Sequence, residues 1–217
     1  MSLTLHFHPL SSYCHKALVS LYETDVPFTP HLVNLGDAQE RETFVKLWPI
    51  GKFPVLRDEA RGQTVPESSI IIEYLQQHYP GKTKLIPGDA ELALPVRESD
   101  RFFDLHVHEQ MGRIIIDRIR PEGQRDSFGV EDAKRRLNTA LSVVDAQMAK
   151  RTWATDETFT MADCAAAPTL FYINMVVQPL RQSYPHVAAY LERLKARPSY
   201  ARVLKEAEPF MHMVPRG

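Results

Sequence analysis

The chain has 217 residues and a formal net charge of -1, and 44% of its residues are hydrophobic. This length suits one large domain or two small ones, and the near-neutral charge predicts no broad attraction to nucleic acid or to an anionic membrane. No apolar run approaches the roughly 20 residues that a transmembrane helix needs, and the N-terminus lacks the features of a secretory signal. Because Cys14 and Cys164 are the only cysteines, we expect no disulfide framework and a cytoplasmic location.

The first third of the chain alternates between strand and helix patterns. Residues 3–7 alternate apolar and polar side chains, which predicts a half-buried strand, and residues 14–22 carry an apolar stripe at helical spacing. A second strand is expected over 28–33, at a sheet edge or a bulge because it contains a proline. Asp37 is placed to cap a short helix that continues through Leu47.

Residues 51–69 combine a predicted hairpin with a predicted peptide-binding edge. Pro54 precedes the short apolar run Val55-Leu56, and the polar segment that follows suits a turn into a second strand over 63–65. We expect the Phe53–Pro54 bond to be cis, since proline tolerates this isomer far better than other residues. That geometry would leave the N–H and C=O of Phe53 free to pair with an extended ligand backbone.

Glu67 and Ser68 follow this hairpin, at the start of a predicted helix over 69–75. Serine is a preferred N-cap residue, and the unpaired N–H groups of a helix N-terminus favour an anion. Glu67 can pair with an ammonium group. Together with the Phe53 backbone, these groups suit a small zwitterionic peptide.

The order of the predicted elements divides the chain into two halves. Seven elements in the order βαβαββα fill about 80 residues, which predicts a thioredoxin-like α/β domain. From residue 91 onward the apolar period is 3.6, and Thr160 and Asp163 form a capping-box variant before an alanine-rich helix. We therefore expect a thioredoxin-like domain over 1–80, a linker over 81–90 and an all-helical domain over 91–217.

Several motifs resemble those of the soluble glutathione transferases, of a bacterial-like, serine type. They read Gly51-Lys52-Phe53-Pro54-Val55-Leu56, Pro66-Glu67-Ser68, Ile71-x-x-Tyr74-Leu75 and, in the helical half, FTMADCAAAP. The resemblance implies that Phe53, before the cis-proline Pro54, pairs with the cysteinyl backbone of glutathione. It also implies that Glu67 and Ser68 hold the γ-glutamyl end and that Lys52 meets the glycyl end. Glutathione would be a co-substrate, no metal would be needed, and the chain would form a homodimer.

The candidate catalytic residue is Ser11, between the first strand and the first helix. A free thiol with a pKa near 8.5 is only a few per cent ionised at pH 7, so the site must stabilise the thiolate. A hydroxyl donor and a helix N-terminus both do so, and Ser11 offers both. The loop resembles those of the theta, delta and zeta classes, which place the catalytic serine at Ser11. Ser12 is the main rival, and the alternative without catalysis is that Ser11 only caps the helix.

Other chemistry-bearing residues favour simpler interpretations. Cys14 falls on the apolar stripe of the first helix, where a packed and inert thiol is expected. His6, His8 and His15 lack a second cluster at metal-ligand spacing, so we predict no metal site. Four residues of the helical half are either core or part of an electrophile pocket: Phe102, Phe103, His106 and Tyr172.

The function predicted from these patterns is attack of the glutathione thiolate on a small apolar electrophile, as in detoxification. Two alternatives stay open: a glutathione-dependent isomerase or dehalogenase, and a non-enzymatic binding protein that kept the transferase fold. The electrophile itself is not encoded in any recognisable pattern of this sequence.

Overall fold

The computed structural model describes residues 2–215, which fall into two compact units. The first contains the chain up to Ile86 together with Ser199–Met211, and the second contains Pro87–Pro198 and the residues from His212 on. Within residues 2–215, none of the helices is both long and apolar enough to cross a membrane.

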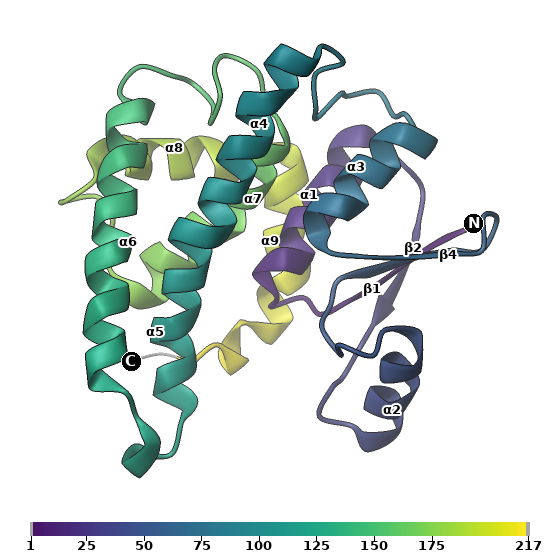
Figure 1. Cartoon of the computed structure of the whole chain (residues 1–217), viewed down its shortest axis with the longest axis horizontal. Helices are drawn as coiled ribbons and strands as arrows, with labels where there is room; N and C mark the ends of the chain where they lie inside the picture. The colour runs from purple at the N-terminus through teal and green to yellow at the C-terminus, as the bar shows by residue number, and fades with distance from the viewer. Residues whose placement is uncertain (1, 216–217) are drawn as a thin grey trace. The chain divides into compact units, whose positions relative to one another are not determined.

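The first unit contains a four-stranded mixed sheet with helices on both faces (Figure 1). Its elements along the chain are β1 (Leu3–Phe7), α1 (Ser12–Thr24), β2 (Thr29–Leu32), α2 (Ala38–Leu47), β3 (Val55–Asp58), β4 (Gln63–Pro66) and α3 (Ser68–His78). The strand order is β2-β1-β3-β4; β2 runs parallel to β1, and the other neighbours are antiparallel. This arrangement confirms the predicted thioredoxin-like α/β fold.

The two faces of the sheet follow from the alternation of side chains in the strands. Leu3 and Leu5 are buried on the face covered by α1 and α3, whereas His6 contacts Phe44 of α2 on the opposite face. Asp37 caps α2 as predicted, since its Oδ1 accepts hydrogen bonds from the N–H groups of Gln39 and Glu40, both at 2.9 Å. Pro30 lies in β2, which is an edge strand of the sheet, as expected for the strand predicted over 28–33.

The segment between α3 and the next helix packs tightly against the first unit. The side chain of Gln76 bonds both backbone groups of Ile86, at 2.6 and 2.9 Å. Gly81 lies so close to α1 that a Cβ atom placed on it would be 2.0 Å from the carbonyl oxygen of Thr24. Leu85 is 1% exposed, so this connection contributes to the core.

The helix α9 (Pro198–Ala207) contributes to the first unit through α1. The Tyr22 hydroxyl donates to Glu206 at 2.7 Å, and the Arg202 guanidinium lies 3.9 Å from the centre of the Tyr22 ring. The buried hydroxyl of Ser199 donates to Glu23. These contacts join α1 to a helix far along the chain, and a short 3-10 helix, η4 (Glu208–Met213), follows α9.

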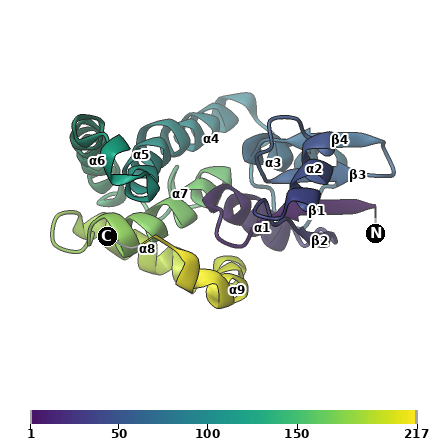
Figure 2. The same cartoon turned by 90° about the horizontal axis from the view of Figure 1, so that it is seen from below.

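All the regular secondary structure in the described part of the second unit is helical, as predicted (Figure 2). Its elements are α4 (Ala90–Phe102), η1 (Phe103–His108), α5 (Glu109–Ile119), η2 (Glu122–Gln124), α6 (Ser127–Met148), α7 (Met161–Tyr172), η3 (Ile173–Val177) and α8 (Pro185–Ala196). The π-helical segments η1 and η3 continue α4 and α7, and α5 packs beside α6. The apolar stripe of α6 is buried, from Ala133 to Met148.

The predicted capping box at the start of α7 forms, and its acidic residue is fully buried. Asp163 accepts hydrogen bonds from the N–H groups of Thr160 and Ala154, both at 2.8 Å. It also accepts from the Tyr190 hydroxyl of α8 at 2.5 Å. Burial raises the pKa of Asp163, while these hydrogen bonds oppose the rise. The carboxyl group thus links a helix start, the preceding loop and α8.

Candidate functional site

Three segments predicted to bind ligand meet at one end of the sheet. His6 of β1 is opposite Val55 of β3, and Val55 is in turn opposite Pro66 of β4. This row marks the point where β1 leaves the sheet, β3 enters it and β4 leaves it. The three adjoining loops therefore emerge together, and they carry Ser11, Lys52–Pro54 and Glu67–Ser68.

The Phe53–Pro54 peptide bond is cis, which confirms that prediction. Within residues 2–215, no hydrogen bond uses the N–H or C=O of Phe53. The Phe53 ring stacks on His8 with centroids 5.8 Å apart and planes 18° apart, and it lies 6.3 Å from the Phe44 ring. Phe53 thus presents its backbone while its side chain packs against His8, directly after β1, and against Phe44 of α2.

Lys52 is exposed beside this loop. It makes no hydrogen bond or ion pair with any other residue in the described range 2–215. Its ammonium group is therefore available to a carboxylate that approaches the end of the sheet.

Glu67 occupies an uncommon backbone conformation, with φ 69° and ψ 117°. A non-glycine residue at positive φ costs roughly 1–3 kcal/mol and persists only where the surroundings enforce it. Its carbonyl accepts the first bond of α3, from Ile71 N–H at 2.8 Å. The Glu67 side chain is exposed and makes no capping hydrogen bond.

The prediction that Ser68 is the N-cap of this helix is wrong by one residue. Glu67 holds the cap position, so Ser68 is the first residue inside α3 and is 5% exposed. The chain turns at Glu67, and Ser68 is already helical, so the helix begins one residue earlier than predicted. The first N–H groups of an α-helix have no acceptor within the helix itself, and α3 begins directly after β4 ends.

Ser11 is the N-cap of α1, and its Oγ accepts a hydrogen bond from the Cys14 N–H at 3.3 Å. Ser11 therefore caps α1, as the capping interpretation predicts. It uses a lone pair of the hydroxyl, which leaves the O–H able to donate. Ser12 is the first residue inside α1.

Cys14 is fully buried, as expected for a packed thiol. Burial raises the pKa of the Cys14 thiol to about 12, although the Ser11 side chain and the His8 backbone lower it. The His8 N–H lies 3.5 Å from the Cys14 Sγ. Because only a thiolate is a good nucleophile, Cys14 is unsuited to attack at neutral pH.

Two residues near this end of the sheet had no assigned role in the sequence. Lys16 is 1% exposed, and its Nζ donates to the Ser69 Oγ at 2.8 Å, which ties α1 to the first turn of α3. The apolar stripe of α1 places Lys16 on the opposite side of the helix, so the sequence carried no signal that this lysine is buried. His8 stacks on Phe53, a contact that strand alternation alone does not reveal.

Among the described residues, no group of three or more His, Cys, Asp or Glu side chains could hold a metal ion. His15 is fully buried, and its Nε2 lies 2.5 Å from the Pro9 carbonyl oxygen.

In the second unit, Phe103 and Tyr172 are core residues at 2% and 5% exposure. Phe102 and His106 instead line a cavity of about 290 Å³ beside α6.

Comparison with known proteins identifies the family. The glutathione S-transferase N-terminal domain family matches residues 5–83, and the glutathione S-transferase C-terminal domain family matches residues 105–198. A glutathione S-transferase-like protein, LUC7, from a Fusarium species is 30% identical over 181 residues, which cover 82% of this chain and 80% of the relative. The chain belongs to the glutathione S-transferase family.

Two solved structures share the fold along nearly the whole chain. A glutathione S-transferase from Methylobacillus flagellatus with glutathione bound has a TM-score of 0.86 and 28% identity, covering 93% of this chain and 98% of that one. A Methylobacterium radiotolerans transferase in complex with glutathione sulfonate has a TM-score of 0.81 and 26% identity, covering 99% and 95%.

Proposed function

We propose that this protein is a serine-type glutathione transferase that ionises the glutathione thiol and directs it to a small apolar electrophile. Family membership supports glutathione as the co-substrate. The observation that carries the proposal for this chain is the convergence of the Ser11, Phe53 and Glu67 loops at one end of the sheet. A tripeptide that lies along this end would meet all three.

In this proposal each part of glutathione has its own partner. The free Phe53 backbone pairs with the cysteinyl backbone, as one strand pairs with another. Glu67 takes the γ-glutamyl ammonium group, and Ser68 with the first N–H groups of α3 takes its carboxylate. Lys52 meets the glycyl carboxylate. The resulting position places the cysteinyl sulfur toward the loop between β1 and α1.

Ser11 then stabilises the thiolate by donating one hydrogen bond to the sulfur. Its hydroxyl is too weakly acidic to ionise at neutral pH, so no alkoxide is available to act as a base. The role of Ser11 is therefore to donate a hydrogen bond. A thiol pKa lowered by about two units corresponds to roughly 2.7 kcal/mol of thiolate stabilisation. The N-terminus of α1 adds a favourable field for the same charge. A charge-assisted hydrogen bond and a helix N-terminus together supply an effect of this size.

The subclass and location are also proposals. The Ser11-Ser12 loop resembles the theta and zeta classes, and we place the protein with this serine type in the cytoplasm. Both cysteines are buried thiols that form no disulfide, which suits a reducing compartment. The zeta-like loop also permits glutathione-dependent isomerisation or dehalogenation, in which glutathione is regenerated.

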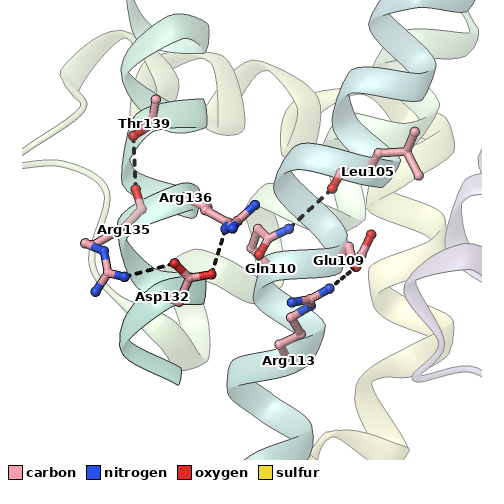
Figure 3. Close-up of polar contacts among 8 residues, drawn as sticks. All are labelled: Leu105, Glu109, Gln110, Arg113, Asp132, Arg135, Arg136 and Thr139. Atoms are coloured by element: carbon pink, nitrogen blue, oxygen red, sulfur yellow. Dashed lines mark hydrogen bonds and ion pairs between the residues drawn. The ribbon is translucent and has the colours of Figure 1, made fainter. Parts of the chain in front are cut away.

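A homodimer is the proposed assembly, and a groove in the second unit is a suitable contact surface. Phe102 and His106 on one wall and Thr139 and Val143 on the other line it, and Val143 is 42% exposed. Gln110 and Arg136 also line this groove, and Figure 3 shows the Arg136 side chain reaching from α6 toward that of Gln110. Val143→Glu should produce monomers in light scattering after gel filtration, and Ile119→Glu, outside the groove, should not.

Calorimetric titration tests the binding site, and a panel of electrophiles tests the reaction. We expect glutathione to bind more tightly than the analogue whose glutamyl residue is joined through its α-carboxyl group. Equal affinities would show that Glu67 and Ser68 do not hold the γ-glutamyl end. Consumption of glutathione with a haloaromatic or epoxide substrate would support conjugation, whereas turnover without glutathione consumption would favour the isomerase alternative.

A further inference from the structure

A cavity of about 570 Å³ lies between α2 and the sheet, on the face opposite α1 and α3. Figure 1 shows α2 on this side of the strands. Its floor is apolar and includes Val33, Phe44 and Leu47, and its rim carries two histidines, two glutamates and one arginine: His6, His31, Glu40, Glu59 and Arg57. The proposed glutathione site uses none of these side chains.

The two histidines of this cavity are direct neighbours in the sheet. His6 of β1 and His31 of β2 are paired in the parallel ladder, so their side chains emerge on the same face. Their ring centroids are 4.6 Å apart, with planes inclined by 49°. His6 is half-buried against Phe44, and His31 is exposed. Neither ring forms a hydrogen bond with any of residues 2–215.

This spacing matches two imidazoles that share one metal ion. At a metal–nitrogen bond of about 2.0–2.1 Å, the ring centres of two ligands lie roughly 4.5 Å apart for a 90° angle and about 5.2 Å apart for a tetrahedral angle. The observed 4.6 Å corresponds to the 90° angle. Adjacent nitrogen ligands at 90° are typical of tetragonal Cu²⁺ and Ni²⁺ sites.

The charges around the cavity also favour a cation. Glu40 and Glu59 contribute two carboxylates against the single guanidinium of Arg57. Arg57 is itself held by Glu59, with a nitrogen–oxygen distance of 3.1 Å. The Glu40 carboxylate accepts the Asn34 N–H at 2.8 Å and keeps lone pairs for water or for an imidazole N–H.

We infer that this cavity binds a divalent late-transition-metal ion, Cu²⁺ in preference to Ni²⁺ and Zn²⁺, through His6 and His31. The order follows the general affinity series of divalent metals for nitrogen ligands. Since the described residues offer no third ligand at bonding distance, water completes the coordination. The ion is therefore exchangeable and is separate from the transferase chemistry.

Binding of Cu²⁺ to the tag-free chain at pH 7.5, in competition with glycine, tests the site. Isothermal titration should show one ion per chain that His6→Gln and His31→Gln each weaken. Loss of a ligand should cost more than the roughly 10–100-fold caused by losing an outer hydrogen-bond partner. The matched control is His186→Gln, which removes an exposed histidine of α8 and should leave the affinity unchanged. Equal affinity in His6→Gln and the wild type would overturn the proposal.

Two spectroscopic measurements need no variant. The electron paramagnetic resonance spectrum of the 1:1 complex should show nitrogen hyperfine splitting from two imidazoles. In proton NMR, substoichiometric Cu²⁺ should broaden the ring signals of His6 and His31 before those of the other seven histidines of the chain. A spectrum with one nitrogen ligand or none, or earlier broadening of other histidines, would overturn the assignment.

Discussion

The Ser11 Oγ accepts a hydrogen bond from the backbone N–H of Cys14 at 3.3 Å, at the first turn of α1. The two side chains differ in what they offer a ligand. Ser11 is half-buried and keeps its donor proton, whereas Cys14 is fully buried and its pKa is raised to about 12. We therefore expect Cys14→Ala to retain most of the transferase activity and to lose some stability. Loss of turnover in a folded Cys14→Ala variant would refute the serine-type mechanism.

Replacing Glu67 by glycine should separate strain from binding. Glu67 has φ 69°, a conformation that glycine adopts without the steric cost that other residues incur. Glu67→Gly should therefore unfold at a temperature equal to or above that of Glu67→Ala. Its free energy of unfolding should exceed that of Glu67→Ala by up to about 1 kcal/mol. Both variants should lose glutathione affinity, because both lack the carboxylate. A glycine variant that binds glutathione normally would exclude Glu67 from the site.

The stability of the protein should fall as the pH drops from about 6.5 to about 4. Burial lowers the pKa of His15 to about 4, although its bond to the Pro9 carbonyl raises it. Between these pH values the unfolded chain binds a proton at this histidine that the folded chain excludes. The free energy of unfolding therefore decreases as the pH falls. The loss from His15 is of order 3 kcal/mol. His6, whose pKa burial and His31 lower to about 4, acts in the same direction.

The matched variant for this pH effect is His15→Gln, which keeps a donor for the Pro9 carbonyl. Urea unfolding at several pH values should show a shallower decline for His15→Gln than for the wild type. Titration of the folded wild-type His15 ring near pH 6.5 in NMR would contradict this prediction.

Gly81→Ala should destabilise the first unit by roughly 1–3 kcal/mol, the usual cost of forcing extra atoms into a packed region. The added Cβ would lie 2.0 Å from the Thr24 carbonyl oxygen, which belongs to a helix and cannot rotate away. Gly88→Ala is the control, since a Cβ at Gly88 meets nothing within 4 Å. Thermal unfolding should separate the two variants, and equal melting temperatures would mean that the close approach at Gly81 is relieved at no cost.

Asp163→Ala should be more destabilising than Tyr190→Phe. Removing the carboxylate leaves two buried N–H groups and the hydroxyls of Tyr190 and Thr160 without this acceptor, whereas Tyr190→Phe removes a single donor. Each buried group left unpaired costs about 1–3 kcal/mol. Urea unfolding provides the measurement, and the reverse order of stability would contradict this account of the capping box.

The sequence predicts the parts of this fold that depend on local patterns. The alternation of β1, the stripe of α1, the Asp37 cap and the Thr160–Asp163 box each involve residues a few positions apart, so periodicity and capping rules suffice. The hairpin and the helix after Glu67 were also predictable from short-range signals, apart from the position of the cap. The positive φ of Glu67 had no signal, because a glycine would be the usual indication of such a conformation.

Contacts between distant segments were not predictable in the same way. The pairing of His6 with His31 depends on β1 and β2 lying parallel in one sheet, and strand alternation explains each histidine separately. The contact of Lys16 with Ser69 depends on the packing of α1 against α3. Tyr22 meets Glu206 only because α9 returns to α1. Each of these pairs is set by tertiary packing, about which a single sequence says little.

The most direct test of the central claim is the pKa of glutathione bound to the wild type and to Ser11→Ala, measured by thiolate absorbance. Our account predicts a pKa well below the ordinary value of about 8.5 in the wild type. In Ser11→Ala it should rise by about one to two units, since a hydrogen bond to a charged group is worth roughly 1.5–3 kcal/mol, with little change in affinity. Ser12→Ala should leave the pKa low. An unchanged pKa in Ser11→Ala, or a raised one only in Ser12→Ala, would contradict the assignment of Ser11.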